Sequence, residues 1–283
     1  MSPAYMSAAA WAELEPQLTE SDISVIRRVA DLRFVSGAQL TRLCFALSDD
    51  PVVNARAARR ALVRLTRLGA LERLTRPIGG ARSGSAGFVY HLGPGGLRFA
   101  ISRGWQPERR GRRSYVPGTL FVRHALQVAE LHTRLVEGDR SRRFELLELT
   151  GEPSCWRPYD GGAGQRLVLK PDSYLRLGLG DFEDSYFIEV DRGTEGSRAI
   201  RRQLGLYAAY HASGREQAEC GVFPRVLWLA PDERRGAVIE AGVAGLNELA
   251  GELFRVALFA DALAIMASEN TGRSTKTLAR SIT

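Results

Sequence analysis

The sequence predicts a two-domain protein of mixed α/β (α+β) class, and three observations lead to this prediction. Its 283 residues are 45% hydrophobic and 25% charged, which is typical of a folded chain of this size. Apolar residues follow helical spacing and then a hairpin pattern in the first third, whereas helix-like and strand-like runs alternate after residue 119. The basic charge is uneven: residues 50–115 hold fourteen arginines and three acidic residues, a net +11, which leaves −4 for the rest of a +7 chain. We therefore expect one polyanion-binding domain joined to a domain of different chemistry.

Several classes of protein are excluded at this stage. The longest mainly apolar stretch, residues 256–267, is twelve residues long and contains Asp261, so we expect no membrane-spanning helix. Residues 1–10 lack the basic and apolar regions of a secretory signal. Three widely spaced cysteines and four histidines provide neither a disulfide framework nor a structural zinc site. We expect a cytoplasmic protein.

The first domain is predicted over residues 19–104, after a flexible leader at 1–18. Thr19 and Asp22 form a capping-box pattern ahead of a helix at about 20–33. A short second helix precedes Asp50-Pro51, and a third helix at about 52–68 ends before Gly69. Strand-like runs at 71–76 and 88–92 flank a Gly/Ser-rich turn, and one more helix follows at 93–104. Three helices followed by a hairpin indicate a winged helix-turn-helix domain.

The third of these helices has two different faces. At 100° per residue its alanines and leucines fill one arc, and its arginines fill the opposite arc. We expect the arginine face to bind double-stranded DNA with the helix in the major groove, assisted by the hairpin turn and by a basic linker at 105–118. The alternative is a merely solvated face and connector. The predicted DNA-binding residues are Arg56, Arg59, Arg60, Arg64 and Arg67 on the helix, Arg82 on the turn, and Arg109, Arg110, Arg112 and Arg113 in the linker.

The second domain is predicted over residues 119–266, before a flexible tail at 267–283. It begins with a helix at 119–137. Strands are expected at 144–149, 166–169, 186–190 and 225–229, and helices at 196–212 and 246–264. This alternation indicates an α/β domain.

Carboxylates follow two of these predicted strands. Asp172 closes the second strand, and Glu189 and Asp191 close the third. Carboxylates on adjacent strands can share Mg²⁺ or Mn²⁺, which can polarise a phosphodiester and activate water. Lys170 stands two residues before Asp172, so the two side chains share a face if the strand continues through Pro171. The alternative is a non-catalytic site that holds no metal.

These residues resemble the PD-(D/E)xK nuclease motif. Pro171-Asp172 followed by Glu189-x-Asp191 is similar to that motif, and Gln203-Leu-Gly-Leu-Tyr207 is similar to the Gln-xxx-Tyr motif of RecB-like members. The resemblance implies a nuclease-like domain in which Asp172 and Glu189 hold the metal, with Glu130 as a further ligand. Asp191 stands where the motif has its lysine, and a carboxylate cannot supply that positive charge; Lys170 is the candidate substitute.

Over residues 18–265 the chain resembles the replication-relaxation family of actinobacterial and firmicute plasmids and integrative elements. The matching residues are Leu18-Thr19, Asp22, His124, Pro171-Asp172, Ile188–Thr194, Leu204, Tyr207 and Tyr210. In that family Glu-x-Asp-Arg-Gly-Thr is the usual form, so Asp191 is a shared departure from the nuclease motif. The resemblance implies a DNA-binding protein, associated with the nucleoid or a plasmid, that acts in replication, relaxation or transfer of a mobile element.

Two functions follow as hypotheses. The first is a non-enzymatic DNA-binding protein that recruits or regulates replication or transfer proteins, with the second domain as a docking surface or homodimer interface. The second is a Mg²⁺- or Mn²⁺-dependent endonuclease targeted by its winged helix.

Overall fold

The computed structural model describes residues 15–74, 87–105, 118–161, 164–247, 251–268 and 276–277, and its class is mixed α/β as predicted. The chain folds into two compact units, residues 1–133 and 134–283. Among the described residues no helix combines the length and apolar character needed to cross a bilayer. Most of the predicted leader, linker and tail, together with the turn that carries Arg82, lies outside the described residues, although residues 15–17 of the leader form the 3-10 turn η1.

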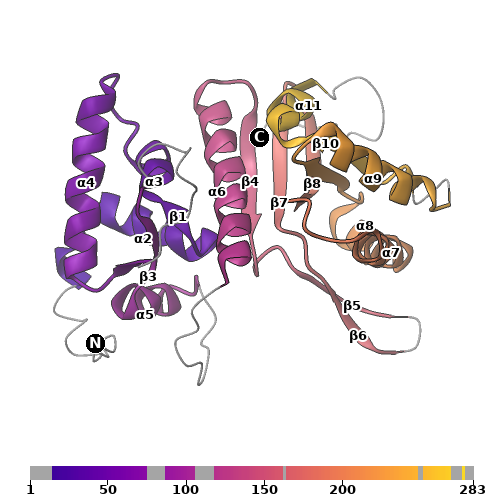
Figure 1. The fold of residues 1–283 in the computed structure, drawn as a ribbon, viewed down its shortest axis with the longest axis horizontal. Helices are drawn as coiled ribbons and strands as arrows, with labels where there is room; N and C mark the ends of the chain where they lie inside the picture. The colour runs from indigo at the N-terminus through magenta and orange to yellow at the C-terminus, as the bar shows by residue number, and fades with distance from the viewer. Residues whose placement is uncertain are drawn as a thin grey trace, which may run out of the picture. The chain divides into compact units, whose positions relative to one another are not determined.

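The first unit combines helices with a small antiparallel sheet (Figure 1). In the sheet, β3 lies between β1 and β2. The three predicted helices and both hairpin strands are confirmed, with boundaries within three residues of expectation. The elements are η1 (Glu15–Gln17), α2 (Glu20–Leu32), β1 (Val35–Ser36), α3 (Gly37–Cys44), α4 (Pro51–Arg67), β2 (Leu71–Arg73), β3 (Val89–Leu92) and α5 (Pro94–Ser102), followed by α6 (Thr119–Arg140), which ends in the second unit.

The helix starts of this unit are determined by local sequence. The Thr19 side chain accepts a hydrogen bond from the backbone N–H of Asp22, whose carboxylate accepts one from the Thr19 N–H, so the predicted capping box is confirmed. Ser36 and Gln39 make the same reciprocal pair at the start of α3. These caps satisfy N–H groups that have no partner within the helix, and so they determine where α2 and α3 begin.

The second unit is built on a six-stranded sheet with the order β10-β9-β8-β7-β4, and β11 pairs with one end of β8. β8, β9 and β10 run parallel, whereas β7 is antiparallel to both β8 and β4. The strands are β4 (Glu145–Gly151), β5 (Arg157–Asp160), β6 (Arg166–Leu169), β7 (Ser173–Leu179), β8 (Phe182–Val190), β9 (Arg225–Ala230), β10 (Phe254–Leu258) and β11 (Lys276–Thr277). The helices after β8 are α7 (Ser197–Ala212), α8 (Arg215–Cys220), α9 (Glu233–Ala244), the 3-10 turn η2 (Phe259–Asp261) and α11 (Ala262–Ser268).

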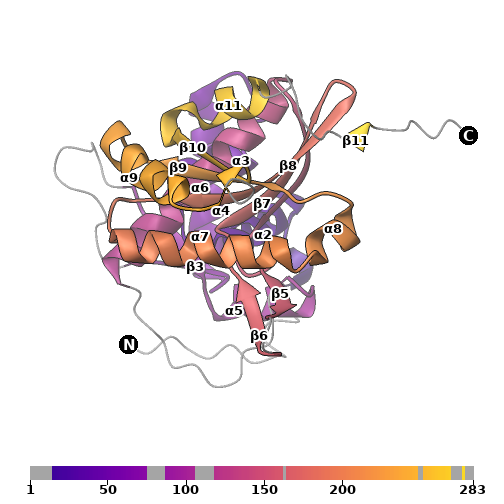
Figure 2. The same cartoon turned by 90° about the vertical axis from the view of Figure 1, so that its right-hand side faces the viewer.

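Helices α7, α8 and α9 lie on one side of this sheet (Figures 1 and 2). Tyr207 and Tyr210 of α7 pack with Phe187 of β8 in a buried aromatic cluster. Ile239 of α9 packs with Trp228 of β9 in a second cluster. Burial of these apolar side chains fixes α7 against β8, which is the strand that carries Glu189.

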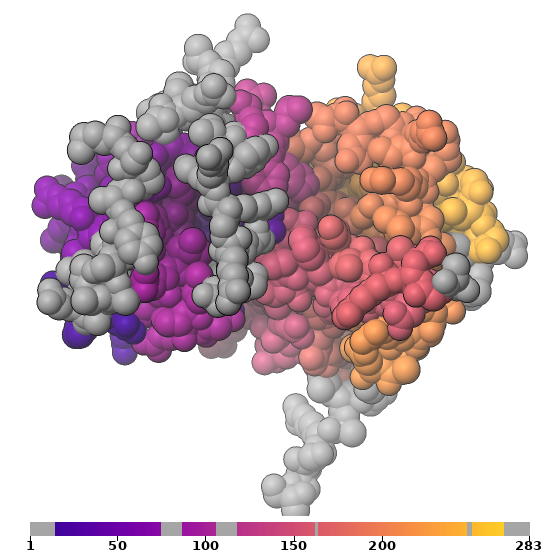
Figure 3. Space-filling model, turned by 90° about the horizontal axis from the view of Figure 1, so that it is seen from below, coloured from indigo at the N-terminus to yellow at the C-terminus, as the bar shows by residue number. Residues whose placement is uncertain are grey.

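One predicted element of the second unit is wrong, and another is present but lies outside the main sheet. The helix expected at 246–264 contains strand β10, because the run from Phe254 to Leu258 pairs in parallel with β9 and gains backbone hydrogen bonds there. The strand predicted at 166–169 exists as β6, but it pairs only with β5, in a hairpin on the surface of this unit (Figures 1 and 3). Asp172 therefore does not end a strand of the main sheet. It stands directly before β7, a strand that we did not expect.

Candidate functional site

Helix α4 carries the arginines predicted to bind DNA. It starts with the Asp50 carboxylate accepting from the Val52 N–H and with Pro51 in its first turn. Its alanine and leucine face is buried, so the opposite face points outward from the first unit. All five predicted arginines of this helix are exposed: Arg56, Arg59, Arg60, Arg64 and Arg67.

Arg64 differs from the other four arginines because it has an internal partner. Its Nη2 lies 2.6 Å from both carboxylate oxygens of Asp22, whose side chain is fully buried, although the Arg64 side chain remains 46% exposed. In the part of the chain that the structure describes, the other four arginines form no ion pair. Arg56, Arg59 and Arg60 line a shallow hollow together with Val53. Within the described residues, the outward positive charge of α4 that has no ion pair therefore lies on Arg56, Arg59, Arg60 and Arg67.

The other predicted DNA-binding residues are those of the hairpin turn and the linker. Arg82 and the linker residues Arg109, Arg110, Arg112 and Arg113 lie outside the described residues.

The structure places Glu130 in the first unit, on α6. Its Oε1 lies 2.7 Å from Nη1 of Arg42, and its Oε2 accepts from the Gln39 amide at 3.1 Å. These contacts join α3 to α6.

In the second unit, Asp172 and Glu189 face each other on adjacent segments of the chain, at one end of the β7–β8 ladder. Ser173 pairs with Ile188 in the β7–β8 ladder, so the residues one step further along are Asp172 and Glu189. The Asp172 N–H donates to the Ile188 carbonyl at 3.0 Å, and its Oδ2 accepts from the Val190 N–H at 2.7 Å. Backbone bonds thus hold Asp172 beside the end of β8.

The Glu189 carboxylate is buried and hydrogen-bonded by α7. Its Oε1 accepts from the Tyr207 hydroxyl at 2.5 Å and from the Gln203 amide at 3.1 Å. Loss of solvation raises the pKa of Glu189 well above its ordinary value, and the nearby Asp172 charge raises it further, against the opposing effect of the two hydrogen bonds. Burial, followed by the charge of Glu189, also raises the pKa of Tyr207. The predicted grouping of Glu189, Gln203 and Tyr207 is present.

Asp191 is held by a residue that sequence reasoning missed. Nε and Nη2 of Arg235, in the first turn of α9, lie 2.8 and 2.7 Å from the two carboxylate oxygens of Asp191. The Asp191 carboxylate also accepts from the Gly193 N–H. The hydrogen bond to Asp191 raises the pKa of Arg235. The two residues are 44 positions apart, and no sequence signal connects them.

Lys170 lies over an aromatic ring. Its Nζ is 4.6 Å from the centroid of the Trp156 ring. Strand β6 ends at Leu169, so the condition for Lys170 and Asp172 to share a strand face, a strand that continues through Pro171, is not met. In the described part of the chain no three histidine, cysteine or acidic side chains are grouped as metal ligands.

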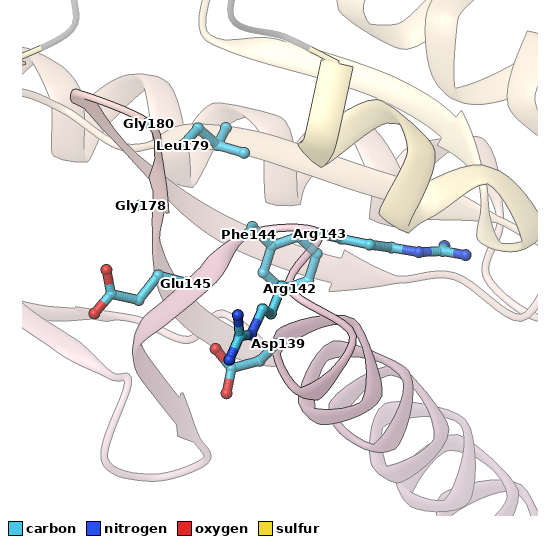
Figure 4. Close-up of a pocket in the computed structure, with 8 residues that line it drawn as sticks. All are labelled: Asp139, Arg142, Arg143, Phe144, Glu145, Gly178, Leu179 and Gly180. Atoms are coloured by element: carbon cyan, nitrogen blue, oxygen red, sulfur yellow. The ribbon is translucent and has the colours of Figure 1, made fainter.

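A cavity of about 550 Å³ also belongs to the second unit (Figure 4). It lies between the end of α6 and the β7–β8 turn. None of the predicted site residues lines it; its lining residues are Asp139, Arg142, Arg143, Phe144, Glu145, Gly178, Leu179 and Gly180.

A family model described as replication-relaxation matches residues 26–226, which include α4, Asp172, Glu189 and all of α7. No curated protein and no solved structure matches the chain.

Proposed function

The chain belongs to the replication-relaxation family, and we propose that it binds double-stranded DNA in the replication or relaxation of a plasmid or other mobile element. In this proposal the first unit is a winged helix-turn-helix domain. Helices α2, α3 and α4 followed by the β2–β3 hairpin support that assignment. The second unit is nuclease-like and non-catalytic, and it serves as the docking surface for replication or transfer proteins or for a second copy.

The single observation that carries the proposal is the arginine face of α4. Arg56, Arg59 and Arg60 project from the first ten residues of a helix whose other face is buried, and they line one hollow with Val53. A helix fits the major groove, and arginine can donate two hydrogen bonds to a guanine edge or to a phosphate. Neutralised phosphates release counterions, so such a face gives salt-dependent affinity.

The Asp22–Arg64 ion pair refines the role of the helix. Both Asp22 oxygens accept from Arg64, and Oδ2 also accepts from the Thr19 N–H and hydroxyl at the cap of α2, so Arg64 ties α4 to α2. We assign Arg64 to positioning α4, and Arg56, Arg59, Arg60 and Arg67 to DNA contact.

The test compares Arg56→Ala/Arg60→Ala with a control of equal charge loss, Arg27→Ala/Arg103→Ala. Each control arginine is half-exposed and paired with an acid of the same unit. On a duplex of random sequence, the α4 variant is expected to bind more weakly. The negative slope of its log affinity against log salt should be less steep by about 2, since each phosphate contact contributes about 0.9 to the steepness. Equal slopes for the two variants would remove α4 from the interface.

A second candidate function, a Mg²⁺- or Mn²⁺-dependent endonuclease, is favoured by the facing carboxylates. Asp172 and Glu189 provide the hard oxygen ligands that these cations prefer, and their mutual repulsion is the kind that a bound cation relieves. Such a cation would polarise a phosphodiester and activate water. Asp191 stands at the position of the motif lysine and is paired with Arg235, so Lys170 is the candidate for the positive charge that the motif lysine supplies.

Incubation of supercoiled plasmid with the protein and Mg²⁺ or Mn²⁺ separates the two functions. Nicking that Asp172→Ala abolishes would establish the endonuclease. DNA binding without nicking above the Asp172→Ala background supports the non-enzymatic function.

A further inference from the structure

Helix α7 has a basic outer face that the site described above does not use. At 100° per residue, Arg198, Arg201, Arg202 and Gly205 lie within an arc of about 100°. All four are exposed, and in the described part of the chain the three arginines have no ion pair. The helix contains no acidic residue. Figure 2 shows α7 in front of the sheet in that view, on the outside of the second unit.

The inner face of the same helix is fully occupied. Ile200 and Leu204 are buried against β9 and α9, while Gln203 and Tyr207 bond Glu189. The arginines therefore stand on the side of α7 that faces away from the core. Their charge is not needed to compensate any buried acid of the fold.

Gly205 supplies a second, independent observation. Glycine in a helix interior costs about 1 kcal/mol relative to alanine. A Cβ at this position would have no atom within 4 Å, so no internal contact excludes a side chain there. Because Gly205 has no side chain, the helix backbone is exposed at this position, one turn after Arg201 and Arg202 on the same face. Glycine at such a position is suited to the close approach of another backbone.

We propose that this outer face of α7, defined by Arg198, Arg201, Arg202 and Gly205, is a second DNA-binding surface that contacts the sugar-phosphate backbone of a duplex. From Arg198 to Gly205 the helix rises roughly 10 Å, a length of duplex axis over which each strand carries about three phosphates, at about 3.4 Å of axis per phosphate. Guanidinium groups suit phosphate oxygens because they donate paired hydrogen bonds. The surface tracks the backbone and reads no base, whereas sequence reading belongs to α4.

This inference extends the proposed function to the second unit, so its test uses the full chain and the α4 variant in parallel. The variant is Arg198→Ala/Arg201→Ala/Arg202→Ala. The matched control, Arg143→Ala/Arg166→Ala/Arg215→Ala, removes three exposed arginines from other elements of the same unit. Affinity for a random-sequence duplex is measured over a range of salt. For the α7 variant, the negative slope of log affinity against log salt is expected to be less steep than that of the control by about 2 to 3.

A slope equal to that of the control overturns the inference. If the α4 variant loses affinity while the α7 variant matches its control, the proposed function stands and the second surface is wrong. If only the α7 variant loses affinity, the α4 assignment is wrong and the second surface stands.

Gly205→Gln provides an independent test of close approach. The side chain enters open space, so thermal melting is expected to be unchanged or higher than in the wild type, whereas DNA affinity falls. Wild-type affinity for this variant would overturn the contact at Gly205.

Discussion

Replacing Arg235 with methionine is expected to destabilise the second unit strongly. The side chains of Arg235 and Asp191 are only 12% and 4% exposed, and the pair is bidentate. Removing one partner of a buried ion pair typically costs 3–5 kcal/mol because the other charge remains buried without compensation. Since the Asp191 carboxylate keeps its bond from the Gly193 N–H, we expect the lower end, about 3 kcal/mol.

Urea denaturation measures this cost. With a slope of about 2 kcal/mol/M, the midpoint of the second unit should fall by about 1.5 M in Arg235→Met. Arg234→Met removes the exposed neighbour on α9 and is expected to stay within about 0.5 kcal/mol of the wild type. Asp191→Asn/Arg235→Met should be more stable than Arg235→Met alone, because it leaves no buried charge. An additive double mutant, or a midpoint shift equal to that of Arg234→Met, would refute the reasoning.

Two further predictions concern pH and packing. Burial raises the pKa of Glu189 in the folded state. The stability that its protonated form contributes is therefore fully present below the pKa of the unfolded state and is lost as pH rises through the pKa of the folded state. Glu189→Gln, which stays neutral and can still accept from Tyr207, should therefore exceed the wild type in stability at neutral pH, with the advantage shrinking toward pH of about 4.3 in urea titrations; a gap independent of pH would contradict this. At Gly96 of α5, a Cβ would lie 2.1 Å from the Ala70 carbonyl oxygen, so Gly96→Ala should cost about 1–3 kcal/mol, whereas Gly205→Ala, which has open space, should be neutral or stabilising in the same assay.

Local sequence was sufficient to predict helices α2 to α5 and the β2–β3 hairpin of the first unit, whereas η1 and strand β1 were not predicted. The capping box at Thr19, the proline-started α4 and its two faces depend on residues within a few positions of one another. The Asp22–Arg64 pair could not be predicted in this way, because 42 residues separate its partners.

The second unit was harder to predict because its strands depend on distant partners. The run at 254–258 is apolar enough for either a helix or a strand, and only the neighbouring β9 decides between them. For the same reason β7 was missed and β6 was placed in the wrong sheet. Asp172 and Glu189 were nevertheless expected on neighbouring strands, and they do face each other, because the short segment between them folds back as the β7–β8 hairpin.

The chemistry of the second unit depends on what neutralises its carboxylates. Arg235 compensates Asp191, and backbone N–H groups and hydroxyl or amide donors bond Asp172 and Glu189. Burial and the Asp172 charge favour a proton on Glu189, and a cation at the same carboxylates would have to displace it. Protonation and metal binding are thus competing ways to satisfy one site. The non-enzymatic function corresponds to the proton, in which case the cluster is a structural link between β8 and α7. The endonuclease corresponds to the cation, in which case the same link positions Glu189 as a ligand at the inner face of α7.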